Sequence, residues 1–599
     1  MAARFEREHQ ARLIGDLSAI RDHMLTYERN YAAELKLIEP AYRPSGRNLL
    51  HYLSLRHHDL RDLQRELAGL GLSSLGRMEA HALAGVDAVL RALHRLGDPP
   101  YPEVDAVEPP VDFVTGPERL ARDADALLGP TRAAHAGRIM VTMPTAAASD
   151  PELVRRLVGA GMDVMRINAA HDGPDAWAGM IEHLDAARRA SGHQCRVLFD
   201  LAGPKLRTEA ITTAERVLRV RARRDPRGKT RRPGELWITR AEDERTAIAG
   251  SSAVVAIDEP LWRHLKWDDV LHMEDSRGKA RIVRIKSQRE DAWAAEVDRT
   301  TYFAEGLPVR LVRNEKERAS GRIVRLHCPP IPVHVHEGEM LTLVRSPEDG
   351  AVEERDASGR LITPARIPCS LETVFDDVQP GEKIWFDDGK IGGIIEHTTA
   401  SQVEVRITHA QEDGSKLAAD KGINLPESKL MMPSMTDKDL EDLDFAATRA
   451  DIIGLSFVRK PADVLLLEQH LRERDAEALG MVLKIETKQG FEMLPRILLA
   501  ALRSPPVGIM VARGDLAVEV GFERLAEVQE EMLWLCEAAH IPVIWATQVL
   551  EGLAKGGAPS RAEVTDAAAS ARAECVMLNK GPYIVETVRF LSDVLQRMQ

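Results

Sequence analysis

The sequence is poor in cysteine and lacks long apolar runs. Its five cysteines (Cys195, Cys328, Cys369, Cys536 and Cys575) are scattered and form no CxxC pair, which is typical of reduced thiols and argues against a thiolate metal site. The longest apolar stretches, such as PVGIMVA and IPVIWA, have the length of strands and fall far short of the roughly 20 residues that a membrane span needs. The opening segment MAARFEREHQARLIGDL is charged and amphipathic, unlike a secretory signal, so we expect a cytoplasmic protein with no membrane partner.

Positive charge is also in deficit. The chain carries 93 acidic and 80 basic side chains, a formal net charge of -13. This excess argues against polyanion binding as the main activity, so we expect no nucleic-acid partner. A local basic cleft for a phosphate-bearing substrate remains compatible with it.

What is present is apolar material for large cores. The chain has 599 residues with 44% hydrophobic and 29% charged side chains, the composition of a soluble globular protein. This length corresponds to about four domains, or to one large barrel with attachments.

Residues 1–132 are expected to form an α-helical N-terminal domain and linker. ARLIGDLSAIRDHMLTYERNY and SLRHHDLRDLQRELAGL place apolar residues at three- and four-residue spacing. The histidines of HYLSLRHHDL have no carboxylate or cysteine to complete a metal site, and we expect them on a solvated helix face. The proline-rich segment DPPYPEVDAVEPPVDFVTGP lacks periodicity and is interpreted as a linker.

From residue 138 onward, short β-branched runs alternate with amphipathic helices. Three such strands (RIMVTM, MDVMRIN and CRVLFDLAG) precede a break in the pattern, and five follow it (DIIGLSFV, MVLKIET, VGIMVARGD, PVIWATQ and ECVMLN). Eight strands alternating with helices predict an α/β fold, a (β/α)8 TIM barrel formed by residues 133–208 and 433–599. A doubly wound sheet is less favoured, because no glycine-rich fingerprint follows the first strand.

The interruption, residues 209–432, is expected to be an inserted all-β lid domain. It contains turn signals and strand-like stretches such as RIVRIKS, MLTLVRS and QVEVRITHA, with almost no helical periodicity. Two of its parts, WDDVLHMEDSRGKARIVRI and PGEKIWFDDGKIGGIIEH, both pair acidic residues with a Gly-Lys turn between strands. This likeness indicates a partial internal duplication.

In a barrel of this kind, the catalytic groups lie at the C-terminal ends of the strands. Here consecutive strands end in charged or polar side chains: Arg166, Asn168 and His171 after the second, Asp200, Lys205 and Arg207 after the third, Ser456 and Arg459 after the fourth, Lys484 and Glu486 at the fifth, Asp515 after the sixth, Thr547 after the seventh and Lys580 after the eighth. Any one of them could serve a loop salt bridge. So many consecutive strands that deliver polar groups to one rim indicate a site.

The residue types suggest phosphoryl transfer. Lys484 and Glu486 are two apart and share one face of an extended strand. Asp515 could join Glu486 in holding Mg²⁺ or Mn²⁺ through oxygen ligands. Arg166 and Lys484 would supply positive charge to a transferring phosphoryl group.

A second set of groups fits a carboxylate. Gly514 and Asp515 open the segment after strand six, where free backbone N–H groups can bind a carboxylate, and Thr547 adds a hydroxyl donor. Together with the cations and the metal, they suit a small substrate that bears both phosphate and carboxylate.

These residues lie in motifs that resemble pyruvate kinase. MVARGDLAVEV, WATQVLE, SRAEVTDAA, LKIET, SFVRK, KGINLP, DVMRIN followed by a histidine, and GPKLRT look like the corresponding stretches of that family, in the same order, and the resemblance covers residues 138–599. MVARGD with the downstream ATQ is the most specific of them. The inserted β-domain lies where pyruvate kinases carry their lid.

The resemblance implies roles for individual residues. Lys484 would be the phosphoryl-transfer lysine, and Glu486 and Asp515 the metal ligands. Gly514 and Thr547 would bind the substrate carboxylate. Phosphates or nucleotide would be held by a further set: Arg166, Asn168, His171, Arg207 and the lid's Lys421.

The chain also departs from the family pattern. Ala170 and Leu201 stand where pyruvate kinases usually have serine and threonine, and VMLNKGPY replaces a Ser-Gly-Glu-Thr loop after strand eight. The family's C-terminal allosteric domain is expected to be absent, and the N-terminal helical region and the enlarged insertion have no counterpart in the usual enzyme.

The monovalent-cation region, formed by Asn168, Asp200 and Lys205, differs most. Many pyruvate kinases hold K⁺ with asparagine, serine, aspartate and a threonine carbonyl, and K⁺-dependent relatives usually have glutamate at the position of Lys205. The lysine ammonium could place its charge where K⁺ would lie, so we expect K⁺ not to be required. The alternative is that Lys205 faces solvent and pairs with an acidic neighbour.

The resemblance implies a Mg²⁺-dependent kinase (or one that uses Mn²⁺) that converts phosphoenolpyruvate and ADP into pyruvate and ATP. A homo-oligomer is one assembly that it allows. Lys484, Arg166 and Thr547 would be its catalytic residues. A related barrel enzyme that acts on another 2-oxo acid or phospho-acceptor is a second hypothesis, favoured by the altered strand-eight loop. A non-catalytic phosphoenolpyruvate sensor is a third, and the joint presence of Lys484, Glu486 and Asp515 argues against it.

Overall fold

The computed structural model describes residues 2–73, 75–96, 107–132, 137–211, 217–225, 227, 229–241, 253–289, 292–327, 332–345, 350–370 and 374–598. The chain divides into two units, one formed by Met1–Lys205 with Asn424–Gln599 and the other by Leu206–Ile423. Each unit is described by itself. Residues 97–106 of the expected linker lie outside the described residues, and its last residues already belong to helix α6 (Thr115–Leu128).

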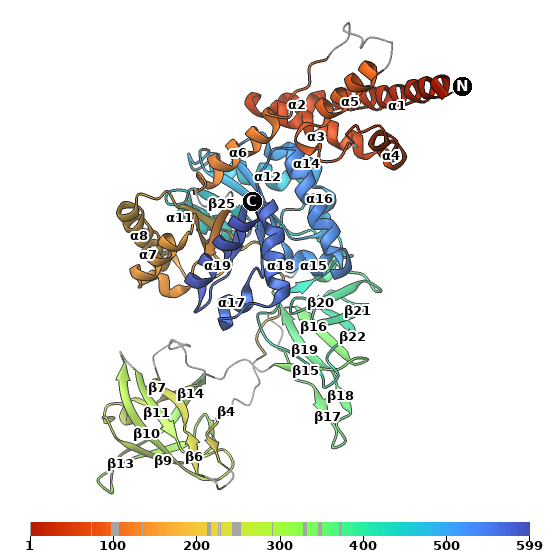
Figure 1. Ribbon diagram of the computed structural model, residues 1–599. Helices are drawn as coiled ribbons and strands as arrows, with labels where there is room; N and C mark the ends of the chain where they lie inside the picture. The colour runs from red at the N-terminus through yellow and green to blue at the C-terminus, as the bar shows by residue number, and fades with distance from the viewer. Residues whose placement is uncertain are drawn as a thin grey trace. The chain divides into compact units, whose positions relative to one another are not determined.

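The first unit contains a closed parallel barrel of eight strands (Figure 1). In order around the barrel these are β1 (Arg138–Thr142), β2 (Val164–Asn168), β3 (Arg196–Asp200), β25 (Ile452–Leu455), β26 (Gly480–Ile485), β27 (Val507–Ala512), β28 (Val543–Ala546) and β29 (Cys575–Leu578). β29 pairs back to β1, with Met577 opposite Met140. The predicted (β/α)8 barrel is therefore confirmed, with three strands before the insertion and five after it.

Helices follow the barrel strands along the chain. They are α7 (Pro151–Ala160), α8 (Pro174–Ser191), α11 (Asp437–Ala446), α12 (Pro461–Arg472), α13 (Lys488–Glu492), α14 (Leu494–Ala501), α15 (Arg513–Val520), α16 (Leu525–Ala538), α17 (Glu551–Gly556), α18 (Arg561–Ala569) and α19 (Ile584–Arg597). Asp150, Thr436 and Ser560 begin three of them, and each side chain accepts a hydrogen bond from a backbone N–H of the first turn. These caps set where the chain leaves the loops of the barrel and turns into a helix.

A layer of apolar side chains fills the barrel interior, and helix α6 packs against it at the N-terminal ends of the strands. Met140, Leu198, Val482 and Ile544 belong to this buried cluster, together with Leu127 of α6. A Cβ atom on Gly480 or Gly508 would lie 2.5 or 2.6 Å from a methyl group of Leu127. Glycine at these strand starts therefore makes room for the α6 leucine at the end of the barrel opposite the C-terminal ends of the strands.

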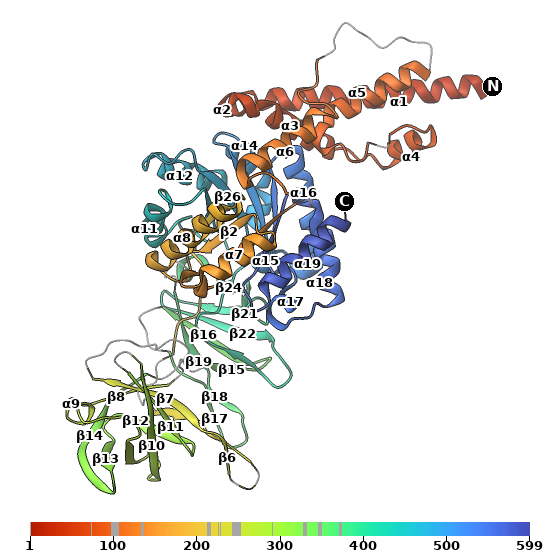
Figure 2. The ribbon, with the colours of Figure 1, turned by 60° about the vertical axis from the view of Figure 1, so that its left-hand side comes forward.

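The N-terminal helices pack on the barrel. They are α1 (Ala2–Asn30), α2 (Ala32–Leu37), α3 (Arg43–Arg56), α4 (Arg61–Gly69) and α5 (Ala82–Leu96), and Figure 2 shows α1 and α5 side by side. Asn48 Nδ2 donates to the carbonyl of Ala538 in α16 (2.9 Å), and the ring of His540 contacts Ser45 Oγ (2.9 Å). The expectation of a solvated histidine face is wrong for His51, whose ring is fully buried beside Glu28.

The second unit holds two sheet systems. One is a closed barrel of seven strands: β7 (Gly234–Arg240), β8 (Val254–Ile257), β9 (Val270–Glu274), β10 (Ala280–Arg289), β11 (Ala292–Val297), β13 (Pro308–Arg313) and β14 (Lys316–His327). With it belong β4 (Val217–Val220), β5 (Arg223–Arg224), β6 (Thr230–Arg232), α9 (Glu259–Trp262) and β12 (Thr301–Ala304).

The other is a six-stranded sheet. Its strands, in order, are β19 (Ala365–Cys369), β16 (Met340–Arg345), β22 (Gln402–His409), β21 (Ile391–Thr398), β20 (Lys383–Phe386) and β24 (Ile423–Asn424). Smaller elements complete it: β15 (Val333–Val335), β17 (Glu354–Arg355), β18 (Leu361–Thr363), α10 (Val374–Asp377) and β23 (Ser415–Leu417). The two look-alike segments form hairpins, β9–β10 in the seven-stranded barrel and β20–β21 in the sheet.

Among the helices that the structure describes, none combines the length and the apolar character that crossing a bilayer requires.

Candidate active site

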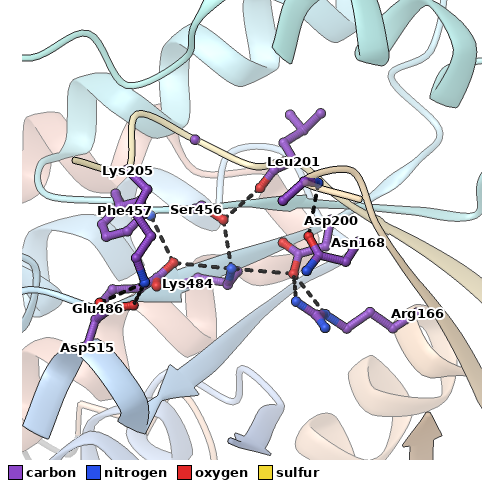
Figure 3. Close-up of polar contacts among 12 residues, drawn as sticks. Arg166, Asn168, Asp200, Leu201, Lys205, Ser456, Phe457, Lys484, Glu486 and Asp515 are labelled. Carbon is purple, nitrogen blue, oxygen red and sulfur yellow. Dashed lines mark hydrogen bonds and ion pairs between the residues drawn. The ribbon is translucent and has the colours of Figure 1, made fainter. Parts of the chain in front are cut away.

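Charged side chains from the barrel strands β2, β3 and β26 and from helix α15 meet at the C-terminal rim of the parallel barrel (Figure 3). Asp200 ends β3 and is 1% exposed. Its Oδ2 accepts hydrogen bonds from Nε (2.8 Å) and Nη2 (2.5 Å) of Arg166, which projects from β2. Arg166 Nη1 donates to Thr142 Oγ1 at the end of β1 (2.8 Å). The guanidinium is thus held by two neighbouring strands.

Lys484 on β26 extends this chain of charges. Its Nζ lies 3.3 Å from Asp200 Oδ2 and 3.2 Å from Glu486 Oε1, and it donates to Ser456 Oγ (2.7 Å). The Ser456 hydroxyl in turn donates to the carbonyl of Leu201 (2.7 Å). The ammonium group is therefore fixed by two carboxylates and one hydroxyl.

Glu486 is held by the neighbouring loop. Its Oε1 accepts from the backbone N–H of Phe457 (3.2 Å), which adopts a left-handed conformation with φ of 55°. Such a conformation is strained for a phenylalanine, and strain of this kind gathers at functional sites.

The electrostatics of this cluster favour a charged Lys484. Burial by itself lowers the pKa of Lys484, but the negative charges of Asp200 and Glu486 outweigh it and hold the pKa above its ordinary value. Burial, together with the charge of Asp515, raises the pKa of Glu486 against the opposing charge of Lys484. The lysine therefore remains an ammonium at neutral pH.

Asp515, in the first turn of α15, forms a second group of contacts. Lys205 Nζ donates to both of its carboxylate oxygens, at 3.0 and 2.9 Å, and Asn424 Nδ2 donates to Oδ1 (3.3 Å). Burial opposes ionisation of Asp515, yet the nearby ammonium of Lys205 keeps its pKa below the ordinary value. Asn424 also approaches Glu519 (3.5 Å), whose pKa burial raises to about 7.

The proposed carboxylate-binding residues are neighbours. A Cβ atom on Gly514 would lie 3.2 Å from Thr547 Cγ2, so glycine keeps the start of α15 close to the end of β28. Thr547 itself has a φ of 74°, and its carbonyl accepts from Arg513 Nη2 (2.7 Å). Arg513 is also paired with Asp566 (2.9 Å), which anchors this corner.

The remaining residues predicted on the barrel make fewer contacts with the charged cluster. Asn168 ends β2, and its Oδ1 accepts from the N–H of Ala170 (3.1 Å), while His171 is exposed in the following loop. Arg459 donates to the Met432 carbonyl (2.6 Å) and so serves the connection back into the barrel.

Two predicted residues belong to the other unit. Arg207 Nη1 lies 3.3 Å from Asp420, and Lys421 Nζ lies 2.8 Å from Asp387. They neighbour each other there, since Thr208 N donates to the Lys421 carbonyl (2.9 Å).

The carboxylates fit a hard divalent cation. Within the described part of the chain, no group of three or more His, Cys, Asp or Glu side chains surrounds a possible metal position. Glu486 is nevertheless a buried oxygen ligand and Asp515 a half-buried one, and their charges interact. The side-chain oxygen of Asn424 beside them is buried and has no hydrogen-bond partner among the described residues. Mg²⁺ is commonly bound by one or two carboxylates, with substrate and water completing its shell, so two protein carboxylates are sufficient.

Sequence comparison assigns the parallel barrel to a protein family. A family model described as "Pyruvate kinase, barrel domain" matches residues 134–226 and 329–588, more than half of the chain. The chain belongs to the pyruvate kinase family. The gap in this match, residues 227–328, contains all seven strands of the seven-stranded barrel.

Pyruvate kinases of three bacteria illustrate the similarity. The chain is 34% identical to the enzyme of Geobacillus stearothermophilus over 266 residues (42% of this chain and 44% of the relative). It is 32% identical to that of Clostridium acetobutylicum over 241 residues (39% and 49%), and 31% identical to that of Thermotoga maritima over 300 residues (49% and 61%). The chain thus spans about half the length of these pyruvate kinases.

Sequence reasoning missed Thr142, Asn424 and Glu519 at this site. Asn424 lies in KGINLP, a motif already noted for its lysine, and Glu519 lies in MVARGDLAVEV. A signal was therefore present for both. For Thr142, which accepts a hydrogen bond from Arg166, the sequence offered only its position at the end of a strand.

Proposed function

We propose that this protein transfers the phosphoryl group of phosphoenolpyruvate to ADP, yielding pyruvate and ATP, with Mg²⁺ or Mn²⁺ as cofactor. The observation that carries the proposal is the buried row of alternating charges Arg166, Asp200, Lys484 and Glu486 at the rim of a pyruvate kinase-family barrel.

Arg166 and Lys484 act on the phosphoryl group. Transfer of this group depends mainly on positioning and on stabilising charge on its oxygens. Asp200 and Ser456 hold the Lys484 ammonium in place, and the raised pKa keeps it protonated. A fixed cation in a water-poor site stabilises developing negative charge without reorganising during the reaction.

Glu486 and Asp515 would hold the divalent cation. When bound, the cation neutralises charge on the phosphoryl oxygens and helps to position them. Lys205 occupies both oxygens of Asp515, so it is the group that must yield part of this carboxylate when a cation binds.

Gly514 and Thr547 would bind the substrate carboxylate. The backbone N–H groups at the start of α15 supply donors, and the close approach of Gly514 to Thr547 brings the threonine hydroxyl to the same place. A solvent-connected donor near Thr547 would protonate the enolate.

The nucleotide would be held by Asn168, His171, Arg207 and Lys421. The latter two lie in the inserted unit, which we propose acts as a lid, with domain boundaries at residues 209 and 432. Its chain leaves and re-enters the barrel at two places, which suits a hinged element.

K⁺ is proposed not to be required. Asn168 Oδ1 already accepts from Ala170 N, the Leu201 carbonyl accepts from Ser456, and Asp200 Oδ2 is contacted by two cations. Lys205 adds a further fixed positive charge at the site. Asp200 Oδ1 is buried and has no hydrogen-bond partner among the described residues, so it is the oxygen that K⁺ would contact if K⁺ were required.

A coupled assay of phosphoenolpyruvate-dependent ATP formation tests the proposal, with purified protein, ADP and Mg²⁺. The Glu486→Gln variant serves as the site control, because it removes one metal ligand and keeps the side-chain shape. ATP formation that needs Mg²⁺ and falls at least about 100-fold in the variant supports the proposal. Turnover of phosphoenolpyruvate without ATP formation would favour a related enzyme with another acceptor.

A further inference from the structure

The seven-stranded barrel is not accounted for by the family match. The pyruvate kinase barrel model leaves residues 227–328 unmatched, and this segment closes around an apolar core that includes Leu236, Ile285, Val297 and Leu311. It is a module with its own core, so its surface can serve a purpose other than phosphoryl transfer.

The charge of this module is opposite to that of the chain. Residues 217–327, which comprise β4 and β5 at the end of the matched segment and the unmatched seven-stranded barrel, contain 25 lysines and arginines against 18 acidic residues, whereas the whole chain has 80 against 93. The average over 599 residues therefore hides a locally basic region. Polyanion binding, which the net charge of the chain argues against, is favoured here.

The basic residues are ordered along one strand. On β4 and the residues after it, Leu218, Val220 and Ala222 are buried, while the arginines at alternate positions are exposed: Arg219, Arg221 and Arg223. Residues two apart on an extended strand share a face and lie about 6.6 Å from each other. The result is a row of guanidinium groups on one side of the strand.

The β5–β6 hairpin adds further cations. Arg227, Lys229, Arg231 and Arg232 are exposed there, but Arg232, which lies opposite Arg223, is paired with Glu235 (3.7 Å). The one acidic side chain among them, Asp225, accepts from the backbone N–H groups of Arg227 (3.0 Å) and Lys229 (2.9 Å) and so serves the turn. We name Arg219, Arg221, Arg223, Arg227, Lys229 and Arg231 the arginine ridge.

One arginine of the ridge is held by an aromatic ring, but the positive charges of the ridge are not neutralised by ion pairs among the described residues. Arg219 and Arg277 both lie over the ring of Tyr302, at 5.7 and 3.7 Å from its centroid. Among the residues that the structure describes, no carboxylate forms an ion pair with a member of the ridge. The six cations outnumber the single carboxylate among them, Asp225, so they repel one another, and a polyanion relieves this repulsion.

We propose that the arginine ridge binds the phosphate groups of single-stranded nucleic acid. A linear row of cations matches a linear polyanion, and basic grooves on small β-barrels track single strands in this way. Arginine, which forms most of the ridge, contacts phosphate through two parallel hydrogen bonds and stacks on bases. A membrane surface fits less well, because the apolar side chain exposed beside the cations on β4 is the small Val217, and no aromatic or leucine side chain belongs to the ridge.

A structural reading of the same residues exists. Charged side chains on an edge strand prevent it from pairing with other chains, and β4 pairs only with β12 among the described strands. That role concerns β4, which carries only Arg219 of the ridge, and does not account for the cations that follow it in the sequence.

Binding is measured by fluorescence anisotropy of a labelled oligouridine of about 16 nucleotides, the upper end of the site size of such barrels. The full-length protein is titrated between about 50 and 200 mM NaCl. The test variant reverses three ridge charges (Arg221→Glu, Arg223→Glu, Arg231→Glu). The control variant reverses three exposed arginines elsewhere on the same barrel (Arg263→Glu, Arg310→Glu, Arg318→Glu), which gives the same change in net charge.

Loss of three phosphate contacts should weaken binding about 100-fold near 0.1 M salt and lower the salt slope by about 2. The control should change the Kd by less than about threefold, because distant surface charges are screened. The proposal would be overturned if both variants bound the oligouridine equally weakly, or if the wild type did not bind it at the lowest salt. It would also be overturned if the wild type bound phosphatidylserine vesicles or inorganic polyphosphate more tightly than the oligouridine at the same phosphate concentration. Kinase activity should be unchanged in both variants.

Discussion

Replacing Asp200 with asparagine removes the one carboxylate that separates two buried cations. Asp200 Oδ2 lies 2.5 Å from Arg166 Nη2 and 3.3 Å from Lys484 Nζ, and its side chain is 1% exposed. The substitution keeps the shape of the side chain and deletes its charge. Arg166 and Lys484 are then left facing a neutral amide.

The size of the effect follows from these distances. At 3.3 Å and an effective dielectric constant of about 20, the attraction of one charge pair is about 5 kcal/mol. Because the amide regains some hydrogen bonding, we expect a loss of about 3 to 5 kcal/mol, as for other buried pairs that lose one partner. At roughly 2 to 4 °C per kcal/mol, the melting temperature should fall by about 10 °C.

The variant should also change the pH profile. Because the charge of Asp200 is the main influence that raises the pKa of Lys484 against burial, its removal lowers that pKa. A raised lysine pKa contributes stability below its unfolded value that is lost as pH rises through the folded value, so the variant should lose this contribution at neutral pH. The alkaline limb of kcat/KM should move to lower pH.

The exposed Asp175→Asn in the first turn of α8 is the matched control, and it should leave both the melting temperature and the pH profile nearly unchanged. A melting temperature and a pH–rate profile of Asp200→Asn that match the wild type would refute the assignment of Asp200 as the charge that supports Lys484.

Three further outcomes follow from the structure. Wild-type activity with Mg²⁺ should be nearly the same when K⁺ is replaced by a bulky organic cation at equal ionic strength, and a strong K⁺ requirement would contradict the proposed K⁺ independence. The Lys205→Glu substitution puts two carboxylates together at Asp515 and should lower kcat/KM at least about tenfold. Burial lowers the pKa of His540 to about 4, so this residue contributes stability above its unfolded pKa that is lost as pH falls below about 6.5. His540→Gln should therefore flatten the loss of stability between pH 7 and 5 in urea unfolding, and an unaltered slope would count against it. Lys421→Ala should raise the KM for ADP more than that for phosphoenolpyruvate in steady-state assays, and an equal effect on both would count against a nucleotide role.

The barrel could be predicted from sequence because its strands are buried on both faces. Runs such as VGIMVA and MVLKI are continuous apolar stretches that end in polar residues, and this pattern identifies both the strand and its catalytic end. Lys484, Glu486 and Asp515 were predicted for that reason, and the structure places each of them at the rim.

The pairings within the site could not be predicted. Lys205 and Asp515 are 310 residues apart, and no local pattern indicates that an ammonium in one loop bonds a carboxylate at the start of a helix. The same holds for Asn424, which lies 91 residues before the Asp515 carboxylate that it contacts. The site residues were thus predicted by their position on strands, whereas their partners depend on how the strands close.

The insertion illustrates a second limit. Alternating strands and turns predicted β structure, but not which strands close into a seven-stranded barrel and which form the six-stranded sheet. Likewise, nothing local predicted that Leu127 of α6 would fill the space left by Gly480 and Gly508. Long-range packing decides both features.

The most direct test of the proposed function compares the wild type with Lys484→Met in phosphoenolpyruvate-dependent ATP formation. The variant keeps an apolar stem of similar length and removes the ammonium that Asp200, Glu486 and Ser456 hold. We predict Mg²⁺-dependent ATP formation by the wild type and a loss of at least about 1,000-fold in kcat for the variant, with phosphoenolpyruvate binding largely retained. Equal ATP formation by both proteins, or none by the wild type with saturating Mg²⁺, would contradict the assignment of this barrel rim as a phosphoryl-transfer site.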